Sequence, residues 1–207
     1  MSLLLLSFVN KTENDAVWFY IFCNFYGIFV AVRISSECMK RRGFAYNSSM
    51  NRKQKIDLSY LLWTLLPLAV GGLSALISMD GMQRNAALPQ PALQPPPWVF
   101  VTAWTILYLL MGLGAGLVWN AVPRGKKDAL IPFYAQLVLN FLWSPLFFAL
   151  ELRLAAFFVL LGMFACAVWM TVAFYRVRKS AGLLQIPYLL WLCFAGYLNL
   201  AAYLING

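Results

Sequence analysis

Long apolar runs separated by short polar segments dominate this sequence. Each run is close to the ~20 residues that a helix needs to cross the hydrocarbon of a bilayer. None carries a charge except near its ends. The pattern therefore predicts an all-α polytopic membrane bundle of five transmembrane helices. In chain order the five runs are residues 58–79, 98–122, 129–150, 152–175 and 183–205.

The second run has a defined start and an aromatic residue at each end. Residues 95–97 are all proline, which lacks an N–H and fixes φ, so the helix should begin after them. Trp98 and Trp119 lie 21 residues apart, which is about one hydrocarbon thickness along a helix. Tryptophan favours both water–lipid boundaries, so these residues are predicted to anchor the helix ends.

A further apolar run, residues 17–32, precedes these five and is short for a span. Acidic residues precede it without a basic n-region, which argues against a cleaved signal peptide. Two interpretations stay open: an extra N-terminal hydrophobic helix, or upstream sequence with translation starting at Met50. The chain is accordingly divided into an N-terminal extension, residues 1–49, and a five-helix membrane domain, residues 50–207.

Composition separates this chain from soluble domains. Charged residues make up 11% of the sequence, against about 25% in a soluble protein. The net charge of +9 does not indicate a nucleic-acid partner, because the basic residues lie between apolar runs, where they orient membrane helices. The lipid bilayer is the expected partner. Histidine, the commonest metal ligand and general base, is absent, so no metal site, required cofactor or catalytic residue is predicted.

The basic residues also predict an orientation. Segments before the first run, after the second and after the fourth hold nine of them, whereas the opposite side holds two, Arg84 and Arg153. The side with more lysine and arginine faces the cytoplasm. We therefore expect an integral protein of a bacterial cell membrane with its C-terminus outside. The nine are Arg52, Lys53, Lys55, Arg124, Lys126, Lys127, Arg176, Arg178 and Lys179.

Proline and glycine mark other positions with structural meaning. Residues 80–97 contain five prolines and are expected to form a semi-rigid lid loop. Gly71 and the adjacent glycine predict either a packing notch or a notch that admits a ligand. The Gly112-x-x-x-Gly116 spacing fits close helix packing or a homodimer. The predicted lid residues are Pro95, Pro96 and Trp98.

Amide and aromatic side chains recur at helical spacing inside three of the runs. Amides in hydrocarbon are costly unless satisfied, so they should point into the bundle. They fit either interhelical hydrogen bonds or a pocket with flat aromatic walls for a planar, mostly apolar ligand. Run by run, these positions are Trp104 and Tyr108; Gln136, Asn140 and Trp143; and Tyr188, Trp191, Ala195 and Asn199.

Three motifs carry a family resemblance. Residues 95–112 read Pro-Pro-x-Trp-x-Phe-x-x-x-Trp-x-x-Leu-Tyr-x-x-Met-Gly, which is similar to the TspO/MBR family of tryptophan-rich sensory proteins and translocator proteins. Residues 134–148 and 187–199 resemble the third and fifth helices of the same family. The resemblance covers about residues 58–206 and implies five helices around a pocket that binds porphyrins. By that likeness the pocket would be lined by Asn140, Trp143, Trp191 and Ala195.

The resemblance implies a receptor, sensor or carrier for tetrapyrroles or related planar hydrophobes, with porphyrin as the expected ligand. The alternatives are a light-dependent porphyrin-degrading enzyme and a purely structural membrane bundle. The lid departs from the family pattern. The tryptophan that the family carries just before the prolines, which is associated with porphyrin breakdown, is Leu93 here, so the enzyme is less favoured than binding alone, and the structural bundle ranks third.

The predicted orientation can be checked by cysteine labelling. In a background without the four native cysteines, a cysteine at Gln90 should react with a membrane-impermeant maleimide added outside intact cells. A cysteine at Lys127 should stay unlabelled until the cells are opened. The reverse pattern would show that the basic loops face out.

Overall fold

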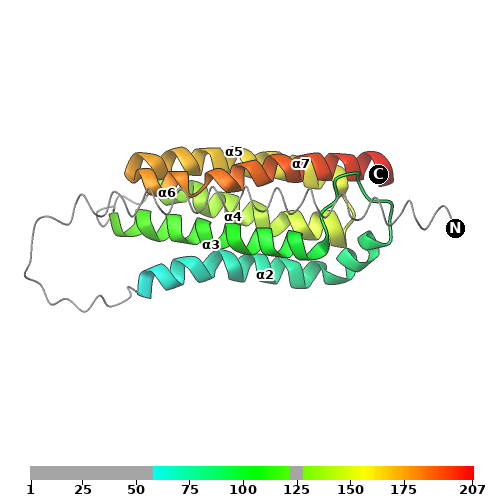
Figure 1. Cartoon of the computed structure of the whole chain (residues 1–207), viewed down its shortest axis with the longest axis horizontal. Coiled ribbons are helices and arrows are strands. Elements are labelled where there is room, and N and C mark those ends of the chain that lie inside the picture. Colours follow the sequence, from blue (N-terminus) through cyan, green and yellow to red (C-terminus); the bar gives the residue numbers. More distant parts are fainter. Residues whose placement is uncertain (1–57, 122–127) are drawn as a thin grey trace, which may run out of the picture. The chain divides into compact units, whose positions relative to one another are not determined.

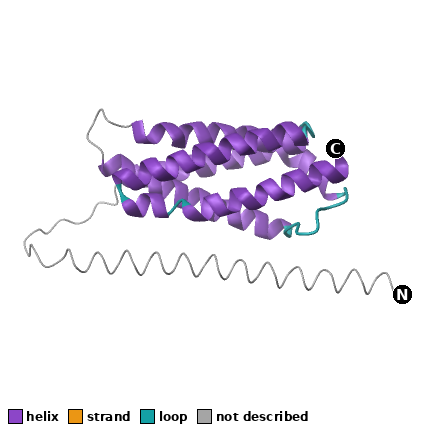
Figure 2. Ribbon diagram, turned by 90° about the horizontal axis from the view of Figure 1, so that it is seen from above, coloured by secondary structure: helices purple, strands orange, loops and turns teal. Residues whose placement is uncertain are grey.

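The computed structural model describes residues 58–121 and 128–207. The predicted extension, residues 1–49, and the basic segment at 124–127 both lie outside the described residues. Within the described part, the chain forms helices and short loops (Figures 1 and 2). In this described part, five spans are long and apolar enough to cross a membrane, so the predicted all-α fold of five transmembrane helices is confirmed.

The long helices follow the predicted runs closely. They are α2 (Leu58–Ala86), α3 (Pro97–Ala121), α4 (Ile131–Ser144), α5 (Arg153–Val177) and α7 (Ile186–Asn206). Shorter helical segments are η1 (Asp128–Leu130), η2 (Pro145–Ala149) and α6 (Lys179–Leu183).

Within the described residues, the helix bundle comprises residues 58–94, 104–121 and 128–207. Within it, α5 packs against both α4 and α7, and α2 packs against α4 and η2 (Figure 1). Residues Pro95–Ala103 belong to a separate unit and are described by themselves. There, the amides of Val99 and Phe100 donate to the Pro96 carbonyl at 3.0 and 3.3 Å, and α3 begins at Pro97, one residue before the predicted start.

The predicted lid loop is shorter than expected. α2 runs on to Ala86, so residues 80–86 are helical and the loop is confined to residues 87–96. Hydropathy marks where the apolar run ends, but polar residues such as Asp80 and Arg84 do not stop a helix. The chain continues as a helix until it approaches Pro89, which cannot extend one.

The third run is not one continuous α-helix. α4 ends at Ser144, and η2 from Pro145 to Ala149 is a π-helix. Proline lacks the N–H for an i to i−4 bond, and a π-turn is a known way to absorb such a break. Glu151 then turns the chain with φ at 56°, and α5 returns beside α4.

The two glycine patterns bring helices of the same chain into close contact. A Cβ at Gly112 would collide with backbone atoms of Trp63 and Thr64, and one at Gly116 would press on the Tyr60 ring. The Gly-x-x-x-Gly spacing therefore brings α3 against α2, and the homodimer stays a prediction. A Cβ at Gly71 would collide with the Tyr108 ring, so this notch receives a side chain of the neighbouring helix.

The close approach of α3 and α2 yields a stability prediction. Gly112→Ala places a methyl against backbone that cannot move independently, and overpacking of this kind costs ~1–3 kcal/mol. Gly72→Ala is the control, because a Cβ there meets no heavy atom of the described residues within 4 Å. Thermal unfolding in detergent, followed by circular dichroism, should show a lower midpoint for Gly112→Ala alone. Equal midpoints would contradict the contact.

Candidate ligand-binding site

Five aromatic side chains from three helices meet in the bundle. Trp104 on α3 is central: its ring centroid lies 5.4 Å from that of Tyr108 and 6.3 Å from that of Trp143 on α4. On α7, the ring centroids of Tyr188 and Trp191 lie 6.3 and 6.4 Å from it. We call these five residues the aromatic cluster. The structure thus brings together four predicted site residues and adds Tyr188.

A chain of hydrogen bonds joins this cluster to buried amides. The Tyr108 hydroxyl donates to Asn140 Oδ1 at 2.7 Å, and Asn140 Nδ2 donates to the Tyr188 hydroxyl at 3.2 Å. That hydroxyl in turn donates to Gln136 Oε1 at 2.8 Å. Gln136 Nε2 completes the chain by donating to Met111 Sδ at 2.6 Å. Both predicted amides are therefore satisfied by interhelical contacts that link α3, α4 and α7.

A second chain of hydrogen bonds begins at Trp143. Its indole Nε1 donates to Asn199 Oδ1 at 3.0 Å, and Asn199 Nδ2 donates to the backbone carbonyl of Arg153 at 2.8 Å. The Trp143 ring also stacks on Phe147 of η2 with centroids 5.3 Å apart. The π-helix thus helps to position one wall of the aromatic cluster.

Ala195 lies on α7 between these two chains. It is one helical turn beyond Trp191 and one before Asn199, and its exposed fraction is 3%. The predicted interior position of Ala195 is therefore confirmed. Its contact with a ligand stays a prediction.

The predicted lid residues lie in the separately described unit, Pro95–Ala103. The Trp98 side chain is 56% exposed, which suits an aromatic residue at a water–lipid boundary. The role of Pro95, Pro96 and Trp98 as a lid stays a prediction.

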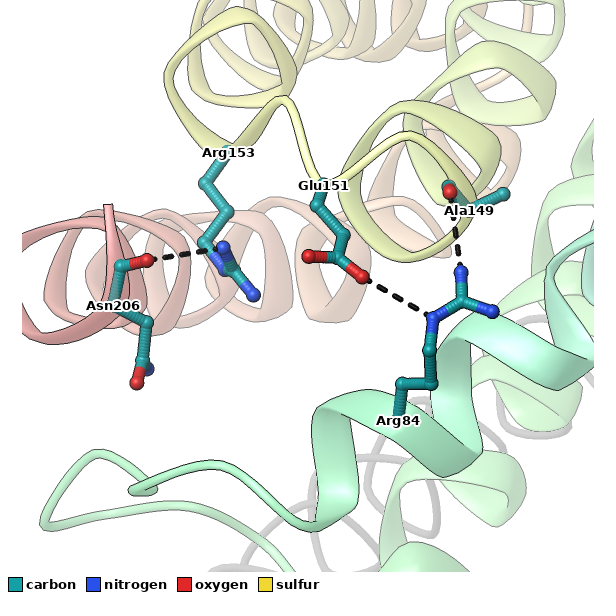
Figure 3. Close-up of polar contacts among 5 residues, drawn as sticks. All are labelled: Arg84, Ala149, Glu151, Arg153 and Asn206. Atoms are coloured by element: carbon teal, nitrogen blue, oxygen red, sulfur yellow. Dashed lines mark hydrogen bonds and ion pairs between the residues drawn. The ribbon is translucent and has the colours of Figure 1, made fainter.

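Charged residues gather at the end of the bundle that holds the loop after α2 and the C-terminus (Figure 3). Arg84 Nε pairs with Glu151 Oε1 at 3.2 Å, and its Nη2 donates to the Ala149 carbonyl at 3.3 Å. Arg153 Nη1 donates to the Asn206 carbonyl at 3.2 Å. We call Arg84, Glu151, Arg153 and Asn206 the terminal polar cluster.

Two residues of these clusters, Tyr188 and Arg153, are not among the site residues predicted from the sequence. Tyr188 was placed on the interior face but not among the site residues, although its spacing from Trp191 was a usable signal. Arg153 was counted as an orientation charge, yet its exposed fraction is 6%. Its burial depends on the packing of α5 against α7 and had no local signal. The described residues contain no group of three His, Cys, Asp or Glu side chains that could hold a metal ion.

Comparison with known proteins extends the motif resemblance over most of the chain. Residues 63–204 match the TspO/MBR family. The tryptophan-rich protein TspO of Archaeoglobus fulgidus is 36% identical over 144 residues, which cover 69% of this chain and 94% of that protein. For the tryptophan-rich sensory protein of Cereibacter sphaeroides the identity is 37% over 160 residues, with coverage of 76% and 95%. For the translocator protein of Bos taurus it is 36% over 141 residues, with coverage of 66% and 83%.

The Tyr188 hydroxyl makes two hydrogen bonds, with Asn140 and Gln136, so its removal should lower the stability of the protein. Tyr188→Phe keeps the ring but leaves buried groups of Gln136 and Asn140 without partners, which costs about 1–3 kcal/mol. Tyr197→Phe, on the same helix but 44% exposed, is the matched control. The thermal midpoint in detergent should fall for Tyr188→Phe only. A drop of the same size in both variants would mean that the buried network contributes nothing specific.

Proposed function

Because the chain belongs to the TspO/MBR family, we propose that it is a membrane receptor, sensor or carrier for tetrapyrroles of the porphyrin or haem type, or related planar hydrophobic molecules. The observation that carries this proposal is the aromatic cluster around Trp104. Flat ring faces suit a planar apolar ligand, and stacked or edge-on ring pairs add about 0.5–1.5 kcal/mol each beyond the buried area.

The buried amides and hydroxyls support the same proposal. They are few, and they lie beside rings, which is the usual composition of a small-molecule site. Because Asn140 bonds both Tyr108 and Tyr188, it fixes two walls of the aromatic cluster at once. A ligand would therefore meet rings that side-chain hydrogen bonds already hold in position.

A light-dependent porphyrin-degrading enzyme is the second candidate. The observation in its favour is that two indoles, Trp104 and Trp191, lie in ring contact inside the aromatic cluster, where an excited porphyrin could oxidise them. Against it, the loop position before the prolines holds Leu93, whose side chain is exposed and has no redox chemistry.

The orientation that we propose follows the count of basic residues. Asn206, near the C-terminus, lies in the terminal polar cluster with Arg84 and Arg153. Arg176 lies in the last turn at the opposite end of α5. We propose that the terminal polar cluster faces the outside of the cell and that the end of α5 with Arg176 faces the cytoplasm.

Tryptophan fluorescence distinguishes these functions. Protoporphyrin IX is titrated into the detergent-purified protein, with empty micelles as the blank, and saturable quenching is the expected result. The complex is then illuminated while porphyrin absorbance is followed. Stable absorbance supports binding alone, whereas bleaching that disappears in Trp191→Phe supports the enzyme. Quenching that never saturates contradicts binding and leaves a structural bundle.

Ala195 gives the sharpest test of the site. If it borders the ligand, Ala195→Thr should lower porphyrin affinity by tenfold or more, about 1.4 kcal/mol, because the added atoms crowd the face between Trp191 and Asn199. Ala115→Thr is the control, because Ala115 is fully buried two turns beyond Tyr108 on α3. Both variants should lose stability by overpacking. Porphyrin affinity equal to that of the parent in Ala195→Thr would remove Ala195 from the site.

A further inference from the structure

Arg153 is a buried cation in an unfavourable place. Its exposed fraction is 6%, and it is the first residue of α5. A guanidinium out of water costs several kcal/mol unless it is paired, and the amino end of a helix is itself positive. Its Nη1 reaches only a neutral carbonyl, that of Asn206. Its Nε is buried and has no hydrogen-bond partner among the described residues.

Among the described residues, no acidic side chain forms an ion pair with Arg153. Glu151 pairs with Arg84, and Figure 3 shows the Glu151 carboxylate between the two arginine side chains with its contact on the Arg84 side. Among the described residues, the ion pair of Arg84 with Glu151 is the one that forms here. The terminal polar cluster therefore holds two cations and one anion, and the buried cation is the one that forms no ion pair.

The backbone of Arg153 is linked to the aromatic cluster through Asn199. Its backbone carbonyl accepts from Asn199, whose side-chain oxygen accepts from the indole of Trp143. Two hydrogen bonds thus separate the backbone of Arg153 from a wall of the aromatic cluster. On its other side, Asn206 Nδ2 donates to the Pro89 carbonyl at 2.9 Å, which holds the loop after α2 over the same end of the bundle.

We propose that the Arg153 guanidinium binds a carboxylate of the ligand that the aromatic cluster holds. This inference rests on the proposed function and narrows its ligand class to planar hydrophobic acids. Such a molecule has an apolar ring system that suits the aromatic cluster and an acidic edge that suits the guanidinium. A guanidinium presents parallel N–H groups that fit a carboxylate, and the unpartnered Nε is one of them.

The test compares protoporphyrin IX, a diacid, with its dimethyl ester, which keeps the ring and lacks the acids. Each is titrated by tryptophan quenching into the parent, Arg153→Gln and Arg176→Gln. The parent should bind the acid more tightly than the ester. Arg153→Gln should lose about tenfold in acid affinity, the value of a charged hydrogen bond, with ester affinity unchanged. Arg176→Gln removes the same charge from an exposed residue at the opposite end of α5 and should retain the parent's preference.

Each other outcome counts against part of the argument. Equal binding of acid and ester by the parent, or an unchanged preference in Arg153→Gln, overturns the carboxylate site but leaves porphyrin binding intact. No saturable binding of either compound overturns the proposed function itself. If added phosphatidylglycerol abolishes the parent's preference, a lipid phosphate occupies Arg153 and the ligand carboxylate does not.

A folding check accompanies these titrations, by size exclusion and thermal midpoint. If Arg153→Gln fails it, Arg153→Lys is measured instead. Lysine keeps the charge but lacks the planar fork, so acid affinity should fall several-fold, about 1 kcal/mol by the same conversion, while ester affinity stays the same. A lysine variant with the parent's acid-to-ester ratio would contradict the guanidinium contact.

Discussion

Hydrocarbon offers no hydrogen bonds, so every polar group inside this bundle must find its partner in the protein. Asn140 and Gln136 on α4 meet that demand through the hydroxyls of Tyr108 and Tyr188. Those contacts fix how α3, α4 and α7 are rotated about their axes, because a different rotation would strand an amide in an apolar interior. Apolar packing selects the rotation of a helix far less strongly, because lipid tails are about as apolar as leucine side chains.

The same hydrogen bonds govern how a ligand can enter. Ring centroids in the aromatic cluster lie 5.4–6.4 Å apart, whereas a flat guest between two rings needs about 7 Å, twice the contact distance of carbon atoms. A planar ligand must therefore stack on an outer face of these rings or turn one of them aside. Asn199 holds Trp143 and Asn140 holds Tyr108 by hydrogen bonds. Turning either ring aside would break its hydrogen bond but would not require the backbone to move.

Hydropathy and helical period were enough to predict the five spans and their interior faces, because both depend on residues close in sequence. The end of α2 at Ala86 and the π-turn at Pro145 were not predictable in that way. The end of α2 depends on a loop that permits the helix to continue. The π-turn depends on how the helix adapts to the N–H that Pro145 lacks. For the site, spacing placed Trp104, Asn140 and Trp191 inside. The two bonds of the Tyr188 hydroxyl arise between separate helices and leave no mark in either one.

Arg153 shows why a charge count along the sequence is incomplete. For orientation each arginine has equal weight, but exposure divides Arg84, at 56% of its side chain, from Arg153, with 6% of the residue accessible. An exposed ion pair contributes about 0–1 kcal/mol, whereas a buried cation without an acid lowers stability. A group that lowers stability is retained most readily where it has a function. The end of a membrane span is a suitable position for a charge that binds a ligand. There the charge escapes the full cost of mid-membrane burial, yet water is sufficiently excluded for one carboxylate contact to be strong.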